Sequence, residues 1–530
     1  MIGITCVGFA KSLSATVALL KLNIMSYNAI LKSENQVLNY EGEKAFVMTP
    51  EMELFTAAVT ASLSDKFYES NKELVERIAR LVPMVSAEFV AKLAVYTRRE
   101  MHLRSVPLLL LVELSRCHNG DNLVSRAVAN TVMRADEISE LLACYQWRNP
   151  SAGIKKLGKL SRQIQDGLKK SFNRFDEYQF AKYDRDSQEV KLKDALFLVH
   201  PKADTPEQQA IFDKIVNGTL ETPYTWETQL SALGQQHFDS EEDKKSAVKN
   251  LWEELLDSGK LGYMALLRNL RNILNAEVSA DHIQRLCDRL SDPEQVRRSK
   301  QLPYRFLSAY KEIIVVKSNY TMTVMNALEK AVLSSIDNVK GFDINTNVLL
   351  ACDISGSMIH PVSAKSSIDL IDVGVLLTSM LRTKCKSVQA GIFGDVWRTV
   401  EPSVNPILNN TVNIRRHEGE VGYSTNGYLA IDWLIENNIR MDKVMFFTDC
   451  QLWNSTWRRG DITKSWNKYK TMFPDAKLYI FDLAGYGQAP LNLKTKDVFL
   501  IAGWSDKVFD ILDAVENGTS IIERVNEVEI

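Results

Sequence analysis

Cysteine pairs and an excess of positive charge are both missing from this sequence, and each absence excludes a class of protein. The seven cysteines are scattered over the 530 residues and never form Cys-x-x-Cys, which argues against a zinc module and a disulfide framework. Because 64 Lys and Arg face 66 Asp and Glu, the formal net charge is only −2. Global basicity therefore does not indicate nucleic acid, and such a partner would need a local basic patch. Unpaired, reduced thiols predict a cytoplasmic protein.

Membrane spans and catalytic motifs are missing as well. The opening stretch Met1–Ile24 is only mildly apolar, is interrupted by Lys11 and Lys21, and is too short and polar to span a membrane, so we expect no membrane partner. Residues 1–25 are expected to be an extension without a structural role, with a signal peptide as the alternative. The seven histidines are dispersed, and no GxSxG, HExxH or P-loop pattern occurs. We therefore do not expect an enzyme.

Glycine is sparse in the first part of the chain and divides the sequence in two. Nine glycines lie between Met25 and Lys340, whereas thirteen lie in the shorter remainder from Gly341. Because glycine weakens helix interiors, residues 26–340 are expected to be helical throughout. Ser86, Ser105 and Ser240 each precede a segment whose apolar residues recur at helical spacing, which predicts that a helix begins after each serine. Short helices joined by brief turns predict a solenoid of degenerate helix pairs, similar to HEAT repeats.

An apolar run followed by three oxygen-bearing side chains opens the second part. The stretch Asn347–Met358, NVLLACDISGSM, predicts a buried parallel strand that ends in Asp353, with Ser355 and Ser357 at alternate positions of a tight loop. Ligands of open α/β sheets gather beyond the carboxyl ends of the strands. Hard oxygen ligands with few carboxylates suit Mg²⁺, or another divalent cation, better than Zn²⁺. The alternative is that Asp353 and Ser355 only cap the following turn.

Two later segments complete this predicted metal site. Thr425 precedes a segment whose apolar residues recur at helical spacing. Val444–Thr448 is a second apolar run, expected to be buried, and Asp449 follows it directly. Further strands are expected at residues 388–393 and 477–481, alternating with helices, which predicts a parallel, doubly wound sheet.

The pattern of these segments resembles the von Willebrand factor A domain over roughly residues 341–530. That resemblance implies a metal-ion-dependent adhesion site in which Ser355, Ser357 and Thr425 ligate directly and two aspartates act mostly through water. The candidate metal residues are therefore Asp353, Ser355, Ser357, Thr425 and Asp449.

Positive charge is concentrated in one stretch of the helical part, although the net charge of the whole chain is close to zero. Between Lys155 and Arg174 there are seven basic residues and one acid, Asp166. Aromatic residues interleave with these charges, as an RNA surface needs for stacking between phosphate contacts; they are Phe172, Phe175, Tyr178, Phe180 and Tyr183. The alternative is a solvated helix face whose aromatics point inward. A second basic cluster, with Arg98, Arg99, His102 and Arg104, either lines an RNA path or is an ordinary solvated loop.

Three stretches together resemble the Ro autoantigen family, which joins a TROVE module to a von Willebrand A domain. They are Leu261–Asn272 (LGYMALLRNLRN), the segment from Lys182 to Lys202, and the Asp353 strand. The resemblance covers about Met25–Ile530 and is of the bacterial type. It implies a monomeric ring of HEAT-like helical repeats closed by the doubly wound α/β A domain. It also implies small noncoding, Y-like RNA on the outer surface and single-stranded 3′ ends of misfolded RNA in the central hole.

The resemblance implies that Lys182, Arg185 and His200 contact the Y-like RNA. The full set of RNA-binding candidates is Lys155, Lys156, Lys159, Arg162, Lys169, Lys170, Arg174, Lys182, Arg185, His200 and Lys202. The leading hypothesis is a protein that scaffolds a small structured RNA and gathers aberrant RNA for an exoribonuclease. The alternative is a protein–protein adaptor whose A domain grasps an acidic partner through Mg²⁺ while the helical repeats dock a second protein.

Overall fold

The computed structural model describes most of the chain beyond its N-terminal segment. The described residues are 36–38, 44–61, 70–150, 159–184, 188–301, 303–336, 346–362, 366–385, 387–403, 406–452, 461–491, 497–503, 508, 511–512 and 521–530. The expected N-terminal extension, residues 1–25, and the candidates Lys155, Lys156 and Arg185 lie outside them. The chain divides into two compact units, one made of residues 1–75 and 287–524, the other of residues 76–286 and 525–530. None of the helices in the described ranges is long and apolar enough to cross a membrane.

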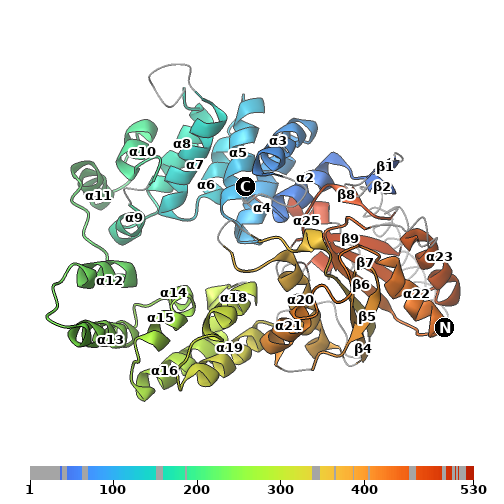
Figure 1. Cartoon of the computed structure of the whole chain (residues 1–530). Coiled ribbons are helices and arrows are strands. Elements are labelled where there is room, and N and C mark those ends of the chain that lie inside the picture. The colour runs from blue at the N-terminus through green and yellow to red at the C-terminus, as the bar shows by residue number, and fades with distance from the viewer. Residues whose placement is uncertain are drawn as a thin grey trace, which may run out of the picture. The chain divides into compact units, whose positions relative to one another are not determined.

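Helices joined by short turns make up the second unit, as Figure 1 shows, and its two divisions from the first unit fall within α3 and α16. In chain order they are α3 (Asn71–Leu81), η1 (Val82–Met84), α4 (Ala87–Arg99), α5 (Ser105–Cys117), α6 (Leu123–Thr131), α7 (Ala135–Arg148), α8 (Arg162–Phe172), α9 (Glu177–Tyr183), α10 (Leu192–Val199), α11 (Pro206–Asn217), α12 (Trp226–Gly234), α13 (Glu241–Asp257), α14 (Tyr263–Arg268), α15 (Leu270–Asn275) and α16 (Ala280–Ser291). Two of the predicted helix starts are true caps, because the hydroxyls of Ser86 and Ser240 accept the N–H groups of Phe89 and Asp243.

The helices pack as neighbouring pairs, with α4 against α5, α5 against α7, and α6 against α8. Gly167 permits the close approach of α8 to α6, since a Cβ atom there would lie 2.6 Å from the Cβ atom of Val128. The predicted helical-repeat architecture is confirmed.

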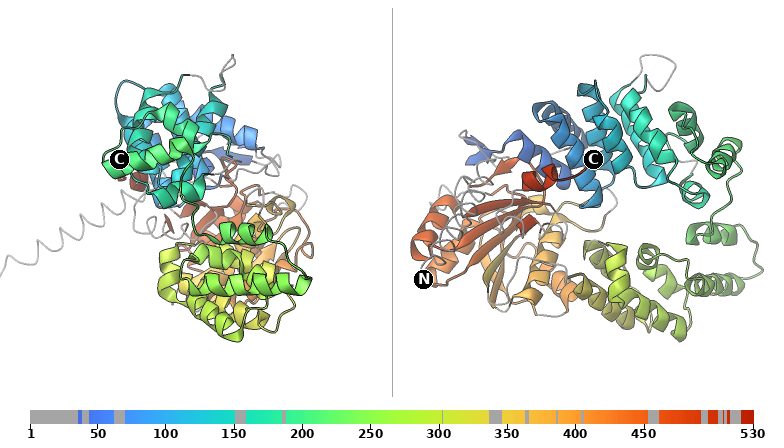
Figure 2. Two further views of the ribbon diagram at one scale, coloured as in Figure 1. Left: turned by 90° about the vertical axis from the view of Figure 1, so that its left-hand side faces the viewer. Right: turned by 180° about the vertical axis from the view of Figure 1, so that it is seen from behind.

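The first unit contains a six-stranded sheet with helices on both faces. Its strands are β3 (Asn347–Asp353), β4 (Ser387–Phe393), β5 (Trp397–Val400), β6 (Lys443–Thr448), β7 (Lys477–Asp482) and β9 (Val498–Ala502). The order is β5-β4-β3-β6-β7-β9, and all neighbours are parallel except β4 and β5. This unit also contains the helices α2 (Pro50–Val59), α17 (Pro293–Ser299), α18 (Pro303–Ile313), α19 (Thr321–Ile336), α20 (Leu370–Lys384), α21 (Ile407–Arg415), α22 (Tyr428–Glu436) and α23 (Ile462–Met472), and most of α25 (Ile521–Asn526). Figure 1 and Figure 2 show α20 with α21 on one side of the sheet and α22 with α23 on the other.

The strand order places the predicted metal residues at the switch point of the sheet. From β3 the chain builds outward through β4 and β5, and from β6 it builds in the opposite direction through β7 and β9. The carboxyl ends of β3 and β6 are therefore neighbours, with Ala351 beside Phe446 and Cys352 beside Phe447. A crevice outside the strand ends at such a point is the usual ligand position in doubly wound folds. The predicted α/β class is confirmed.

A small second sheet corrects the expectation that the first part of the chain is helical throughout. Strands β1 (Gln36–Leu38) and β2 (Lys44–Val47) pair antiparallel, and β2 also pairs with β8 (Gln488–Ala489). Strand β8 lies in the α/β part of the sequence, far from residue 44, so the local sequence around β2 could not predict that β2 pairs with β8.

Candidate functional site

The Asp353 loop brings three oxygen-bearing side chains together at the end of β3. Asp353 accepts the N–H of Ser355 at 2.9 Å with Oδ1 and the hydroxyl of Thr448 at 2.6 Å with Oδ2. The hydroxyls of Ser355 and Ser357 are 3.2 Å apart. All three loop side chains are buried. The predicted spacing thus does more than cap a turn, since it directs two hydroxyls to one point beside a fixed carboxylate.

Thr425 and Asp449 join this cluster through the backbone of Gln451. The Thr425 hydroxyl donates to the Gln451 carbonyl at 2.7 Å, and Asp449 Oδ1 accepts the Gln451 N–H at 3.1 Å. The N–H of Gly356 donates to the carbonyl of Tyr423 at 3.4 Å, which ties the Asp353 loop to the loop that carries Thr425. A hydroxyl that donates to a carbonyl keeps its oxygen lone pairs for a cation. The structure therefore places all five predicted metal residues in one neighbourhood.

The turn between β4 and β5 holds the Thr425 loop in place. Asp395 in this turn accepts the N–H of Ser424 at 3.1 Å, and the carbonyl of Gly394 accepts the N–H of Asn426 at 3.2 Å. Gly422 has a φ of +78°, and a Cβ atom there would lie 2.1 Å from Asp395 Oδ2. Sequence reasoning missed Asp395, although its position directly after the predicted strand 388–393 was a usable signal.

Asp353 and Asp449 are two fully buried carboxylates in this site. Burial, followed by the negative charge of Asp449, raises the pKa of Asp353 to about 7, although hydrogen bonds from Ser355 and Thr448 oppose the rise. Burial also raises the pKa of the thiols of Cys352 and Cys450.

The donors are therefore carboxylate and hydroxyl oxygens. Within the ranges described, no group of three or more His, Cys, Asp and Glu side chains forms a metal site of another type. Hydroxyl oxygens beside one or two carboxylates fit a hard divalent cation such as Mg²⁺.

The basic candidates of α8 and the following turn differ in what they contact. Arg162 keeps 92% of its side chain exposed and lies 3.8 Å from Asp166, which Lys169 bonds at 2.9 Å. Arg174 donates to the carbonyls of Ala129 and Val132, where α6 ends, and burial lowers the pKa of its guanidinium. Lys159 and Lys170 are exposed. Arg174 therefore caps a neighbouring helix although part of its side chain is exposed, whereas Lys159, Arg162 and Lys170 extend into solvent.

The interleaved aromatic residues separate into inward and outward groups. Phe172, Phe175 and Phe180 are buried and contact one another, with ring centroids 5.8 to 5.9 Å apart. Tyr178 is exposed on α9, and Lys182, on the last turn of that helix, lies 5.6 Å from its ring centroid.

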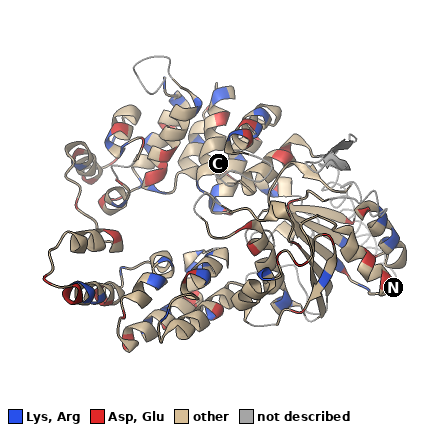
Figure 3. Cartoon of the chain, in the orientation of Figure 1, with Lys and Arg blue, Asp and Glu red and all other residues tan. Residues whose placement is uncertain are grey.

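The last RNA-binding candidates, His200 and Lys202, lie after α10. His200 ends α10 in the left-handed region, and Lys202 follows with its carbonyl bonded to Asn173 at 2.9 Å. Figure 3 shows Lys and Arg interspersed with Asp and Glu along these helices. The exposed cations therefore lie among acids and do not form a continuous stripe.

The second basic cluster is largely paired with acids of α7. Arg98 bonds Glu137 at 2.8 Å, and Arg104 bonds Asp136 at 2.6 Å. Arg99 donates to the carbonyl of Asn130 at 3.2 Å. These contacts tie α4 and α5 to α6 and α7, so most of this charge is used within the protein.

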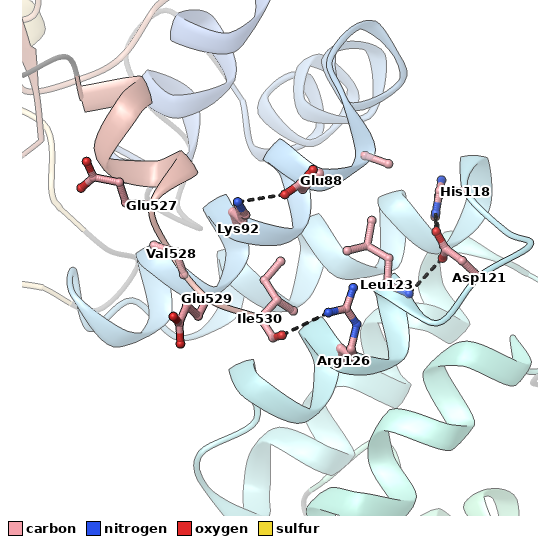
Figure 4. Close-up of a pocket in the computed structure, with 11 residues that line it drawn as sticks. Glu88, Lys92, His118, Asp121, Leu123, Arg126, Glu527, Val528, Glu529 and Ile530 are labelled. Atoms are coloured by element: carbon pink, nitrogen blue, oxygen red, sulfur yellow. Dashed lines mark hydrogen bonds and ion pairs between the residues drawn. The ribbon is translucent and has the colours of Figure 1, made fainter.

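Figure 4 shows a cavity of about 710 Å³ in the helical unit, between α4, α6 and residues Glu527–Ile530. Several of its charged groups pair with one another. Lys92 bonds Glu88 at 2.9 Å and the Asn526 carbonyl at 2.6 Å, and His118 bonds Asp121 at 3.0 Å. Nothing in the sequence pattern indicated this cavity.

Comparisons with known proteins agree with this architecture. Residues 39–248 and 218–339 match the family model of the TROVE domain, and residues 347–515 match that of the Ro60 vWA domain. Telomerase protein component 1 of Rattus norvegicus is 39% identical over 94 residues, which are 18% of this chain and 3% of the rat protein. The RNA-binding protein RO60 of Caenorhabditis elegans is 23% identical over 286 residues, which are 51% of this chain and 42% of the worm protein. The chain thus spans less than half the length of these relatives.

A solved structure shares the fold. The crystal structure of the Deinococcus radiodurans RO (RSR) protein superimposes with a TM-score of 0.59 at 18% sequence identity. The match covers 89% of this chain and 100% of the Deinococcus chain. At this identity the likeness supports the arrangement of helices and strands alone.

Proposed function

This chain belongs to the Ro family, since the TROVE match covers more than half of it and the Ro60 vWA match most of the remainder, and on this premise we propose that it binds RNA. The observation that carries the proposal is the basic surface of α8 and α9. Arg162 and Lys170 are exposed, and Lys182 is half-buried beside the exposed ring of Tyr178. The net charge of the whole chain is only −2, so this positive charge is local. Most of the affinity is electrostatic, because counterions are released as cations meet phosphates. A worm relative is named an RNA-binding protein, which agrees with this assignment.

The proposed partner is a small structured, Y-like noncoding RNA, selected by shape, with single-stranded 3′ ends of misfolded RNA as a second ligand. The protein acts in the cytoplasm as a binding protein, not as an enzyme, and presents bound RNA to an exoribonuclease. In this proposal, residues 26–340 form the RNA-binding part and residues 341–530 the metal-binding part.

Measuring RNA affinity against salt tests the proposal. Replacing Arg162, Lys170 and Lys182 by Gln should weaken binding of a small hairpin RNA. It should also lower the slope of log K against log salt by roughly 0.9 for each phosphate that the protein no longer neutralises. A matched control replaces Arg297 and Arg298 by Gln, which are exposed cations bonded to Glu294. Equally weakened binding in both variants, or no binding by the wild type at low salt, would count against RNA recognition at this surface.

We also propose that Asp353, Ser355, Ser357, Thr425 and Asp449 hold Mg²⁺ or another divalent cation. When bound, the ion supplies a positive charge that an acidic group of a partner can reach. The surrounding residues keep the donors in position: Thr448 fixes the Asp353 carboxylate, and the Gln451 backbone fixes Thr425 and Asp449. The presence of two buried carboxylates, whose mutual repulsion helps to raise the pKa of Asp353, supports this assignment.

The same site favours a second candidate function, a protein–protein adaptor that docks an acidic partner on the ion. Purification discriminates between the two functions. Protein that carries nucleic acid removable by ribonuclease favours RNA binding. Protein that is free of nucleic acid and binds no structured RNA at low salt favours the adaptor.

A further inference from the structure

Asn426, the residue after Thr425, has a buried amide oxygen that accepts no hydrogen bond from any residue that the structure describes. The whole residue is only 6% exposed. A buried acceptor without a donor costs free energy, because the oxygen has lost the water that would otherwise bond it. The oxygen is therefore available to a partner other than the described polypeptide.

The other polar groups of Asn426 fix the orientation of this amide. Its backbone N–H donates to the carbonyl of Gly394 at 3.2 Å, and its Nδ2 donates to the carbonyl of Asp395 at 3.4 Å. A rotated amide would set its oxygen against the Asp395 carbonyl, and two acceptors cannot bond each other. The amide nitrogen therefore faces the turn between β4 and β5, and the oxygen lies on the other branch of the side chain.

Asn426 and the Asp353 loop are anchored on the same strand end. The carbonyl of Phe393, the last residue of β4, accepts the N–H of Ile354 at 3.2 Å, and the two residues after Phe393 hold Asn426. Asn426 also follows Thr425 directly, and Thr425 is one of the proposed metal residues. The unbonded oxygen thus belongs to the same group of loops as the proposed metal site.

A second asparagine of this unit is equally buried but has no such oxygen. Asn410, on α21, is also 6% exposed, and its Nδ2 donates to the carbonyl of Ser403 at 2.6 Å. Within the described part of the chain, no buried polar atom of Asn410 lacks a partner. Burial alone therefore does not explain the unbonded oxygen of Asn426.

We propose that the amide oxygen of Asn426 is a further oxygen donor of the proposed metal site and faces the shell of the bound cation. This inference rests on the proposed metal site and deepens it, because it adds a neutral donor beside two carboxylates. Hard divalent cations take amide carbonyl oxygens as ligands and keep waters that need an acceptor. The Asp395 carbonyl holds the amide nitrogen, so Asp395 is a positioning residue for this donor.

Stabilisation of the full chain by Mg²⁺ tests the inference. Thermal unfolding is recorded in a chelator and at a series of Mg²⁺ concentrations, and the rise of Tm with concentration gives the apparent Kd. Asn426→Ala removes both ends of the amide, whereas Asn426→Asp keeps an oxygen acceptor and loses the nitrogen donor. The second variant therefore distinguishes an oxygen that faces the ion from a nitrogen that only holds the loop. The matched control is Asn410→Ala.

Asn426→Ala should raise the apparent Kd for Mg²⁺ about tenfold or more, as the loss of groups around a bound metal does in other proteins. Asn426→Asp should unfold at a lower temperature than the wild type in the chelator, because a third carboxylate is then buried near Asp353 and Asp449. Mg²⁺ should raise the Tm of Asn426→Asp by more than it raises that of the wild type. Asn410→Ala should lower Tm equally under both conditions and leave the Kd unchanged.

Failure of the inference is distinguishable from failure of the metal site. If Mg²⁺ stabilises the wild type and Asn426→Ala with the same Kd, the oxygen does not belong to the site. If Asn426→Asp loses the response to Mg²⁺, the residue acts only through its nitrogen, and this variant decides alone should Asn426→Ala not unfold cooperatively. If Mg²⁺ does not stabilise the wild type, the proposed metal site fails and the inference fails with it.

Discussion

At the scale of single residues, Asp353 shows what the metal site costs the protein when no ion is bound. Its carboxylate is fully buried and faces the charge of Asp449, and these two effects together raise its pKa to about 7. The hydrogen bonds from Ser355 and Thr448 only partly offset this cost. A divalent cation would replace the repulsion between the carboxylates by attraction. In the proposed metal site, the two buried carboxylates therefore lower the stability of the metal-free protein, and a bound cation would offset that loss.

Replacing Asp353 by Asn tests how much stability the buried carboxylate costs the metal-free protein. At pH 7 the variant should be more stable to heat than the wild type in a chelator, by roughly 1 to 3 kcal/mol, because the buried repulsion is gone. It should also lose the stabilisation that Mg²⁺ gives the wild type. Thermal unfolding with chelator and with Mg²⁺ measures both effects.

Asp372→Asn is the matched control for this substitution. Asp372 is equally buried, but Lys311 bonds it at 2.6 Å. Its replacement should destabilise the protein under both conditions, since the Lys311 ammonium loses its partner. An Asp353→Asn variant that is destabilised in the chelator would contradict the assigned repulsion between the Asp353 and Asp449 carboxylates.

The basic residues near α8 make a second prediction at this scale, because two arginines of the same stretch have different roles. Arg174→Ala should destabilise the helical unit by about 1 to 2 kcal/mol, since the carbonyls of Ala129 and Val132 lose a charged donor. Arg162→Ala should change stability by less than about 0.5 kcal/mol, because this side chain is 92% exposed and its ion pair with Asp166, at 3.8 Å, lies at the surface. Urea unfolding of the two variants provides the measurement, and equal destabilisation would show that Arg174 is no cap.

At the scale of elements, the turn between β4 and β5 positions the loop that supplies Thr425. Gly422→Ala should weaken the stabilisation by Mg²⁺, because a Cβ atom 2.1 Å from Asp395 Oδ2 displaces either the loop or the carboxylate that holds it. The matched control is Gly218→Ala, where φ is +67° and nothing lies within 4 Å of the added carbon. That control should cost roughly 1 to 2 kcal/mol from backbone strain alone and leave the response to Mg²⁺ intact. Titrating Mg²⁺ against the unfolding temperature separates the two effects.

The junction of α19 with α21 gives a pH-dependent prediction. The Glu329 carboxylate accepts the N–H groups of Leu408 and Asn409 at 3.0 and 2.9 Å, at the start of α21. Burial raises the pKa of Glu329 above its ordinary 4.5, although these hydrogen bonds oppose the rise. The folded state thus holds the proton more tightly than the unfolded state, so the contribution of Glu329 to stability falls as pH rises from about 4.5 through the raised pKa.

Glu329→Gln removes this titration, so the variant should gain stability relative to the wild type across that pH window. Urea midpoints at a series of pH values give the difference. Glu294→Gln should show the opposite trend, because Arg297 and Arg298 lower the pKa of Glu294 and its contribution is lost as pH falls through that lowered pKa. A difference for Glu329→Gln that does not vary with pH would exclude the assigned role.

These elements also show which parts of the site the sequence could predict. The ends of β3 and β6 were predictable because each apolar run is followed at once by an aspartate, and parallel strands bring such ends to one edge. Ser86 and Ser240 were predictable because a cap is a local signal. Contacts between elements were not. The pairing of β2 with β8 and the packing of Arg134 on Tyr183 join segments whose own sequences do not encode the partner.

At the scale of the whole molecule, the two candidate sites belong to different parts of the chain. The metal residues lie in the unit formed by residues 1–75 and 287–524, and the basic candidates from Lys159 to Lys202 lie in the other. A chain of net charge −2 has no general attraction for nucleic acid, so its affinity depends on the local cations of the helical unit.

RNA affinity should therefore be independent of the metal site. Asp353→Ala should abolish the stabilisation by Mg²⁺ yet bind a hairpin RNA with wild-type affinity and salt slope, whereas Lys182→Gln should change RNA binding and leave the response to Mg²⁺ unaltered. The comparison uses variants in one buffer of constant Mg²⁺, because chelation would also change the fold of the RNA. Anisotropy titrations and thermal unfolding of the same preparations measure both properties. If Asp353→Ala lowers RNA affinity while its melting curve remains cooperative, the two sites are energetically coupled, and the coupling free energy follows from the double variant.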